Sequence, residues 1–185
     1  TISSTAEGMR QLAADEPPGA LEKINRKKLE ALGIRKDVVN AFLENYVYTP
    51  LEKTMLVGEL DTMKGVENME AFISHAILAT DESLAVYYRL NAMMMAGYHK
   101  NVAPAARIAN LPHEPGFLTK SGVLVLTSAL DYLFWTQDLS RILDEVEQAI
   151  AKISGVKGKE LWLMGKVDGT ARKIVETRGW KVTEN

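Results

Sequence analysis

Apolar residues recur at helical spacing through the first half of the chain, and glycine, proline and capping residues punctuate the pattern. The segment Thr49-Pro50-Leu51-Glu52 is a strong helix start. Threonine caps the first turn, proline suits its first position, and glutamate can bond back to the cap. Gly33 and Gly65 stand where helices are expected to end. We therefore predict helices over residues 20–32, 36–45, 50–63, 67–79 and 81–100.

The pattern changes at Pro104, where short apolar runs replace the helical spacing. Residues 105–110 and 122–127 are typical of strands, and a hairpin-like connection containing Pro112, Pro115 and Gly116 separates them. Residues 131–135 form a third strand or continue the second strand after a bend. Thr136 then begins an amphipathic helix with apolar residues at i, i+3, i+4 and i+7, and Gly155 ends it.

The C-terminal end has the pattern of a strand, a short helix and a second strand. An apolar run over 160–165 precedes a helical stretch that begins near Thr170, and Gly179 follows as a left-handed helix stop before the strand at Trp180. Such a crossover joins parallel strands. The fold class is therefore predicted to be α+β, with a helical N-terminal layer packed on a small mixed sheet and a C-terminal β-α-β-α-β parallel unit.

Domain boundaries follow the same changes of pattern. Residues 1–19 are small and polar, and we expect an arm or linker there, although Met9 and Leu12 can dock one short helix. Residues 20–185 are predicted to form a single α+β domain, with a helical part over 20–102 and a sheet-containing part over 103–185.

Composition narrows the class of protein without defining its function. The chain has 185 residues, 46% of them hydrophobic and 25% charged, which is ordinary for a soluble globular protein. A net charge of −2 offers no general attraction to nucleic acid. A basic run over residues 23–36 is interpreted as the solvated face of a helix. We expect no nucleic-acid partner and, since no apolar run is long enough, no membrane span.

The cysteine count and the first residue bear on localisation. The chain has no cysteine, which excludes disulfides, thiolate metal sites and cysteine nucleophiles, and slightly favours a secreted or periplasmic bacterial protein. It begins at Thr1 instead of Met, so we expect a processed or excised form whose targeting segment is not part of this chain.

One loop meets the physical criteria for a ligand site. Ligands of parallel α/β sheets bind beyond the carboxyl ends of the strands, and here that position is a small-residue loop that leads into a helix. Its candidate binding residues are Gly165, Lys166, Asp168, Gly169 and Thr170. An anion would be held by free backbone N–H groups. The alternative is purely structural, with Asp168 or Thr170 capping the helix. Asp131 would lie beside this loop if the two preceding strands are neighbours.

The three histidines show no metal-binding pattern. His75, His99 and His113 lack a second ligand at HExxH-type spacing, and we predict neither a metal site nor a cofactor. His113 lies in the proline-rich connection, where functional residues are more frequent than in a core, and it is a weak catalytic candidate together with Asp131.

Two functional hypotheses remain open. The first is a non-enzymatic interaction or accessory module with a protein partner, suggested by the lack of a catalytic motif and by the segment Met93-Met94-Met95. The alternative is an enzyme or a binding protein for an anionic small molecule, with its site at the 165–170 loop and Asp131 or His113 as acid or base.

Overall fold

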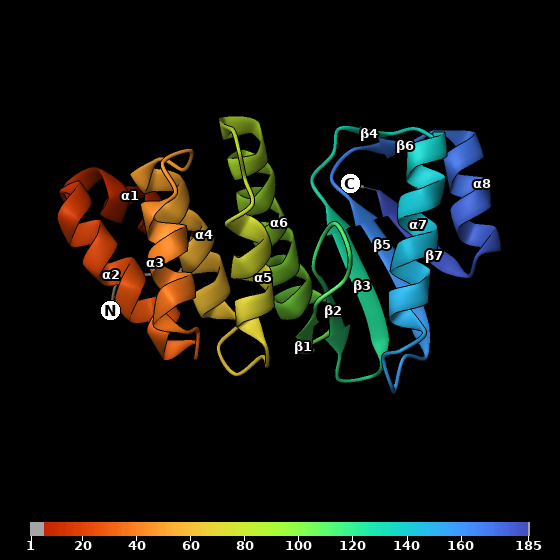
Figure 1. Ribbon diagram of the computed structural model, residues 1–185, viewed down its shortest axis with the longest axis horizontal. Helices are drawn as coiled ribbons and strands as arrows, with labels where there is room; N and C mark the ends of the chain where they lie inside the picture. Colours follow the sequence, from red (N-terminus) through yellow and green to blue (C-terminus); the bar gives the residue numbers. More distant parts are fainter. Residues whose placement is uncertain (1–5, 185) are drawn as a thin grey trace. The chain divides into compact units, whose positions relative to one another are not determined.

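The computed structural model describes residues 6–184 and divides the chain into two units, the first ending at Val102 and the second beginning at Ala103 (Figure 1). Within the described residues, six helices build the first unit. They are α1 (Ala6–Asp15), α2 (Pro18–Ala31), α3 (Lys36–Glu44), α4 (Pro50–Thr62), α5 (Met69–Ala76) and α6 (Glu82–Asn101). The bounds of α2 to α6 match the five predicted helices within a few residues.

Helix α4 is the centre of the first unit. It packs against α1, α2 and α6, and its residues Leu56, Val57 and Leu60 are completely buried. The predicted capping box is confirmed. The Thr49 Oγ1 accepts the Glu52 backbone N–H at 3.2 Å, and the Glu52 carboxylate accepts the Thr49 N–H at 3.2 Å. The cap therefore sets the start of the helix on which the neighbouring helices pack.

Helix α1 lies within the segment expected to be an arm or linker. Met9 and Leu12 form its buried face. This part of the segment is therefore a docked short helix. Met9 packs against α4 at Gly58, where an added Cβ would lie 1.7 Å from the Met9 sulfur. The missing side chain of Gly58 thus makes room for α1 to dock.

The second unit contains a five-stranded mixed sheet. Its strands are β1 (Ala105–Ala109), β2 (Gly116–Thr119), β3 (Val123–Ser128), β5 (Gly158–Leu163) and β7 (Trp180–Glu184), in the spatial order β1-β2-β3-β5-β7. The pairs β1–β2 and β2–β3 are antiparallel, whereas β3–β5 and β5–β7 are parallel. The α+β class is confirmed, as is the C-terminal β-α-β-α-β unit, with α7 (Gln137–Ile150) and α8 (Gly169–Thr177) as crossovers.

Strand β2 is the element of the five-stranded sheet that the sequence pattern fails to predict. The connection with Pro112, Pro115 and Gly116 is not a simple hairpin loop, because the residues from Gly116 onward form a strand between β1 and β3. All four residues of β2 are buried, so no alternation of apolar and polar residues marks the strand. A four-residue run next to two prolines therefore resembles a loop in sequence.

Both crossover helices pack on one face of the sheet, as Figure 1 shows for α7 and α8. Leu143, Val146 and Ile150 of α7 form one core with Ala171 and Val175 of α8. The strands complete this core with Leu118, Leu124, Leu126, Leu161, Leu163 and Trp180. Complete burial of each large apolar side chain contributes about 2 kcal/mol, so this shared core holds the two crossovers to the sheet.

A pair of glycine variants tests how α1 docks. Gly58→Ala gains helix propensity but displaces Met9, whereas Gly97→Ala gains the same propensity in α6, where an added Cβ meets nothing within 4 Å. We expect Gly58→Ala to be about 2 kcal/mol less stable than Gly97→Ala in urea unfolding, with faster proteolysis within α1. Equal stability and equal proteolysis would show that Met9 repacks without loss.

Candidate functional site

The carboxyl ends of β3 and β5 lead into two segments that are bonded to each other. Residues 130–133 and 165–168 run side by side and contain the short parallel strands β4 (Tyr132–Leu133) and β6 (Lys166–Val167). Three backbone N–H groups donate to carbonyl oxygens across this pair, from Gly165 to Leu130 (3.0 Å), from Lys166 to Asp131 (2.9 Å) and from Asp168 to Leu133 (3.0 Å). We call this pair of segments the loop staple.

Gly165 is required for the loop staple to close. A Cβ at this position would lie 1.8 Å from the carbonyl oxygen of Asp131, which is a backbone atom and cannot rotate away. The structure therefore places Asp131 next to the 165–170 loop, as expected if β3 and β5 are neighbours. The contact is made by the backbone of Asp131.

Asp168 caps α8 and holds the other segment of the loop staple at the same time. Its carboxylate accepts the backbone N–H of Thr170 at 2.7 Å, of Ala171 at 3.4 Å and of Trp135 at 2.9 Å. The bond from Trp135 is the largest of the causes that lower the pKa of Asp168. The capping role of Asp168 is confirmed. Backbone donors that an anion would use at this helix start are thus bonded to a carboxylate.

Lys166, the cation expected to assist an anionic ligand, faces a carboxylate. Its Nζ lies 3.8 Å from Glu184, which also pairs with Arg172 at 2.9 Å. The Val167 backbone N–H donates to Glu184 at 2.7 Å and is the main cause of a lowered pKa of Glu184. Gly169 and Thr170 lie in the first turn of α8. The charged groups of the loop are therefore bonded within the chain.

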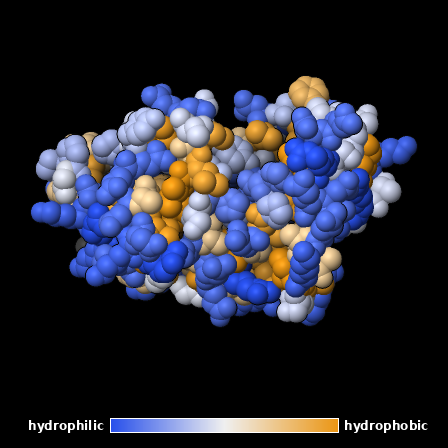
Figure 2. Space-filling view, viewed as in Figure 1, coloured by the Kyte–Doolittle hydropathy of each residue, from blue (hydrophilic) through white to orange (hydrophobic). Residues whose placement is uncertain are grey.

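An exposed aromatic pair lies at the end of the 130–133 segment of the loop staple, with Tyr132 inside it and Phe134 just after it. The ring centroids of Tyr132 and Phe134 are 4.3 Å apart. Tyr132 is 46% exposed and Phe134 is 61% exposed. Leu130 is also 40% exposed. We call these three residues the aromatic patch. Apolar side chains reach the surface at the end of the second unit that carries β4 and β6 (Figure 2). Sequence reasoning missed this patch, although two aromatic residues at i and i+2 between Asp131 and a helix cap are its signal.

His113 belongs to a different part of the second unit. Its backbone has a left-handed φ of 70°, and its Nε2 lies 2.6 Å from a carboxylate oxygen of Glu145 on α7. The His113 hydrogen bond is the first cause of a lowered pKa of Glu145, and Arg141 adds to it at 2.9 Å. His113 therefore joins the connection before β2 to α7.

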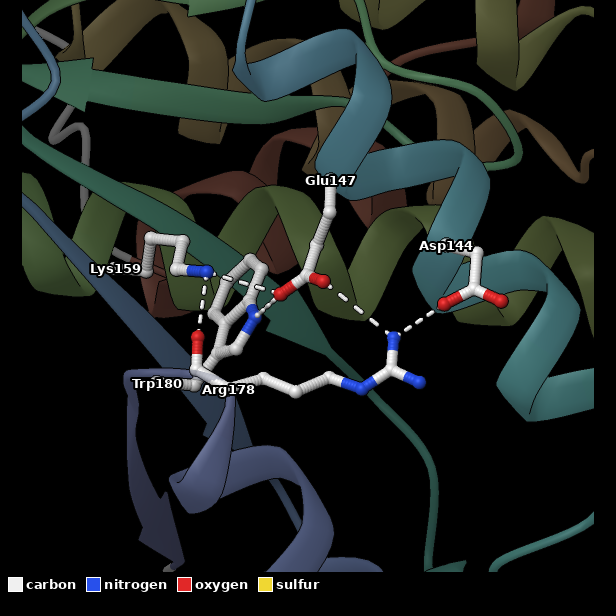
Figure 3. A network of polar contacts seen from close by, with 5 residues as sticks. All are labelled: Asp144, Glu147, Lys159, Arg178 and Trp180. Carbon is white, nitrogen blue, oxygen red and sulfur yellow. Dashed lines mark hydrogen bonds and ion pairs between the residues drawn. The ribbon is translucent and has the colours of Figure 1, made fainter.

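A second polar cluster joins α7 to the strands β5 and β7, and we call it the Glu147 cluster (Figure 3). The Glu147 carboxylate accepts from the Lys159 ammonium at 2.9 Å and from the Trp180 indole N–H at 3.0 Å. Arg178 lies 3.4 Å from Glu147 and also pairs with Asp144. Lys159 donates to the Arg178 carbonyl at 2.7 Å and lies over the Trp180 ring. Helical spacing alone places these carboxylates on a solvated face.

An open groove of about 450 Å³ lies beside the Glu147 cluster, at the amino ends of β5 and β7. Ile150, Ile153 and Val156 form its apolar part, and Lys157 and Lys159 contribute its cations. Lys159 is bonded within the Glu147 cluster, so Lys157 is the exposed lysine of the groove.

Three of the six basic residues in the run over 23–36 form ion pairs. Arg26 pairs with Glu22 at 3.0 Å, and Lys28 pairs with Asp61 at 3.2 Å. Arg35 pairs with Glu70 at 2.9 Å. These pairs offset about half of the positive charge of the run.

Neither a metal-binding cluster among the described residues nor a match to a known protein indicates a function for the chain. Among residues 6–184, no three His, Cys, Asp or Glu side chains are grouped so that they could hold a metal ion. No helix in the described part of the chain is long and apolar enough to cross a membrane. No protein-family model, curated protein or solved structure matches the chain. The geometry of the sites described above is therefore what bears on function.

The Glu147 cluster predicts a pH-dependent contribution to stability. Burial alone would raise the pKa of Glu147, but hydrogen bonds from Lys159 and Trp180 outweigh it, and the pKa is lowered. The contribution is therefore present above the pKa of unfolded glutamate and is lost as the pH falls through the folded value. We expect Glu147→Gln to lose about 2 kcal/mol near neutral pH, and to approach the wild type in acid.

Urea unfolding over a series of pH values measures this effect. The control is Glu176→Gln, which removes an exposed helix carboxylate paired with Arg172 at 3.2 Å and should change stability by less than about 0.5 kcal/mol. A Glu147→Gln loss that stays constant down to strongly acidic pH would contradict the charge-based account.

Proposed function

We propose that this protein is a non-enzymatic interaction module that binds an extended segment of a partner protein along β4. The observation that carries the proposal is the aromatic patch. A stacked pair of half-exposed aromatic rings on a short strand is a costly surface feature, and such apolar patches are typical of binding surfaces.

The backbone of β4 offers a free edge for such a segment. Neighbouring residues of a strand direct their N–H and C=O groups to opposite sides of the strand. The backbone groups of Asp131 and Leu133 are directed toward β6 and bond to it. Tyr132 and Phe134 therefore direct theirs away from β6. In the described part of the chain, the partners of residues 130–135 in hydrogen bonds to other elements are residues 165–168, on the β6 side of β4. An added strand would pair with this open edge.

The side chains indicate what the partner segment must contain. Tyr132 and Phe134 are two residues apart, so their rings lie on one face of the strand, in keeping with their stacking. A matching segment would carry apolar side chains at alternate positions, with its backbone extended. The contact is only a few residues long, so we expect weak and transient binding.

The methionine-rich segment gives this hypothesis less support than its sequence suggests. Met95 is completely buried, and Met93 and Met94 are only partly accessible. These side chains are mainly packing residues of α6. The surface proposed here lies in the second unit instead.

The alternative, an anionic ligand or substrate at the 165–170 loop, has weaker support. A ligand at the start of α8 would have to displace the Asp168 carboxylate from Thr170 and Ala171, and Lys166 already faces Glu184. Of the two acid–base candidates, His113 is bonded to Glu145 on α7, whereas Asp131 belongs to the loop staple. We therefore favour the interaction module.

Peptide selection tests the proposal directly. Peptides selected from a random library on the whole protein should be extended and carry alternating apolar residues, and their binding should perturb the backbone amides of residues 130–135 in NMR spectra. We expect the double variant Tyr132→Ala/Phe134→Ala to lose at least about tenfold in affinity, because aromatic anchors dominate small interfaces.

The matched control is Tyr46→Ala, which removes a 90% exposed aromatic residue from the first unit. It should leave the affinity of the same peptides unchanged. If the selected peptides bind the double variant as tightly as the wild type, or if they depend on Tyr46 instead, docking along β4 is wrong.

A further inference from the structure

The connection between β1 and β2 contains an unusual turn. The Glu114 backbone N–H donates to the Pro112 carbonyl at 2.9 Å, and His113 between them has a left-handed φ of 70°. A hydrogen bond that spans two residues around a positive φ defines the rarer of the two γ-turn forms, which is strained. We call residues 112–114 the His113 turn. Strain of this kind persists only where surrounding contacts hold the backbone in place.

The chain on both sides of the His113 turn is fixed in the second unit. Leu111 is 2% exposed and belongs to the core that α7 shares with the sheet. Gly116 begins β2, and an added Cβ there would lie 2.9 Å from the backbone oxygen of Val125 on β3. Pro115 is buried as well. The His113 turn is therefore a more accessible segment between two anchored ends.

An ion pair joins the His113 turn to α7. The His113 Nε2 lies 2.6 Å from the Glu145 Oε2, and Arg141 donates to the Glu145 Oε1 at 2.9 Å. Each carboxylate oxygen thus faces a different donor. The side chains of His113 and Glu145 are 38% and 40% exposed, so protons from solvent reach both. Because the central residue of the turn makes this contact, the contact acts directly on the strained backbone.

The charge of this contact depends on pH. Histidine is the side chain that ordinarily changes its charge between about pH 5 and 8. Three charged groups of α7 face His113 or its partner, namely Glu145, Arg141 and Asp138, which lies 3.7 Å from Arg141. Glu114 is the acidic neighbour on the same turn. The His113 hydrogen bond is the first cause of a lowered pKa of Glu145, so this carboxylate stays ionised through the range in which a histidine gains its charge.

We propose that the His113 turn is a pH-dependent latch on α7, closed in mild acid and loosened above neutral pH. A charged imidazole forms an ion pair with Glu145 that holds the strained turn, whereas a neutral imidazole keeps at most an uncharged donor for the same oxygen. The contribution of the ion pair is therefore lost as the pH rises through the range of histidine titration, and lost again in strong acid when Glu145 is protonated. Opening uncovers Glu145 for other partners, so pH controls access to this side of α7.

Solvent exchange of the Glu114 amide in the whole protein, measured by NMR as protection relative to an unfolded peptide at the same pH, tests the latch. We expect this protection to be about threefold higher at about pH 5.5 than at about pH 8.5, because half-exposed ion pairs change an equilibrium by a small factor. His113→Asn retains a residue that tolerates a positive φ but has no titrating group, and Glu145→Gln removes the charge of the partner. Each variant should show equal protection at the two pH values.

The matched control is Asp138→Asn, which removes a charge from the same helix at a residue paired with Arg141, and it should keep the wild-type difference. Equal protection of the wild type at both pH values would overturn the proposal, as would a difference that persists in His113→Asn or Glu145→Gln. Loss of the difference in Asp138→Asn would assign the effect to the general charge of α7 and not to the latch. His113 and Glu145 are half-exposed, so we expect their variants to fold, which circular dichroism verifies.

Discussion

The approach of Gly165 to the Asp131 carbonyl is the constraint on which the end of the second unit that carries β4 and β6 depends. Only a glycine fits there, because a Cβ would overlap a backbone oxygen. Once the two segments touch, the three N–H groups of the loop staple can bond across it, and Asp168 can reach Trp135. The same carboxylate then starts α8. One steric condition thus links the exit of β3, the exit of β5 and the second crossover helix.

This arrangement explains why the loop that usually binds ligands in a parallel sheet here holds the segments after β3 and β5 together. The carboxyl ends of parallel strands usually leave N–H groups free for a ligand. Here Asp168 and Glu184 supply the negative charge from within the chain. The backbone N–H groups of Trp135 and Val167 donate to them and are the main causes of their lowered pKa values. The aromatic patch beside the loop staple remains exposed. This geometry favours our proposal that a segment of protein, and not a free anion, is recognised at this end.

The elements that the sequence predicts are those with strong periodic or capping signals. The Thr49 capping box, the stripe of the helix after Thr136 and the Gly179 stop follow from local chemistry, and all lie where expected. Strand β2 escapes prediction because both of its faces are buried and its run is short. The candidate loop does lie next to Asp131, but spacing alone cannot show that Asp168 bonds to Trp135, 33 residues away. Likewise, helical spacing makes Glu147 an exposed residue, whereas Lys159 and Trp180 reach it from two strands.

Native-state amide hydrogen exchange of the variant Gly165→Ala tests this constraint most directly. We expect the amides of Lys166 and Asp168, which donate across the loop staple, to lose their protection, while the core of α7 keeps its own. Gly169→Ala is the matched comparison, since an added Cβ there meets nothing within 4 Å, and it should leave the exchange of these amides unchanged. Wild-type protection of Lys166 and Asp168 in Gly165→Ala would show that the loop staple does not depend on this contact.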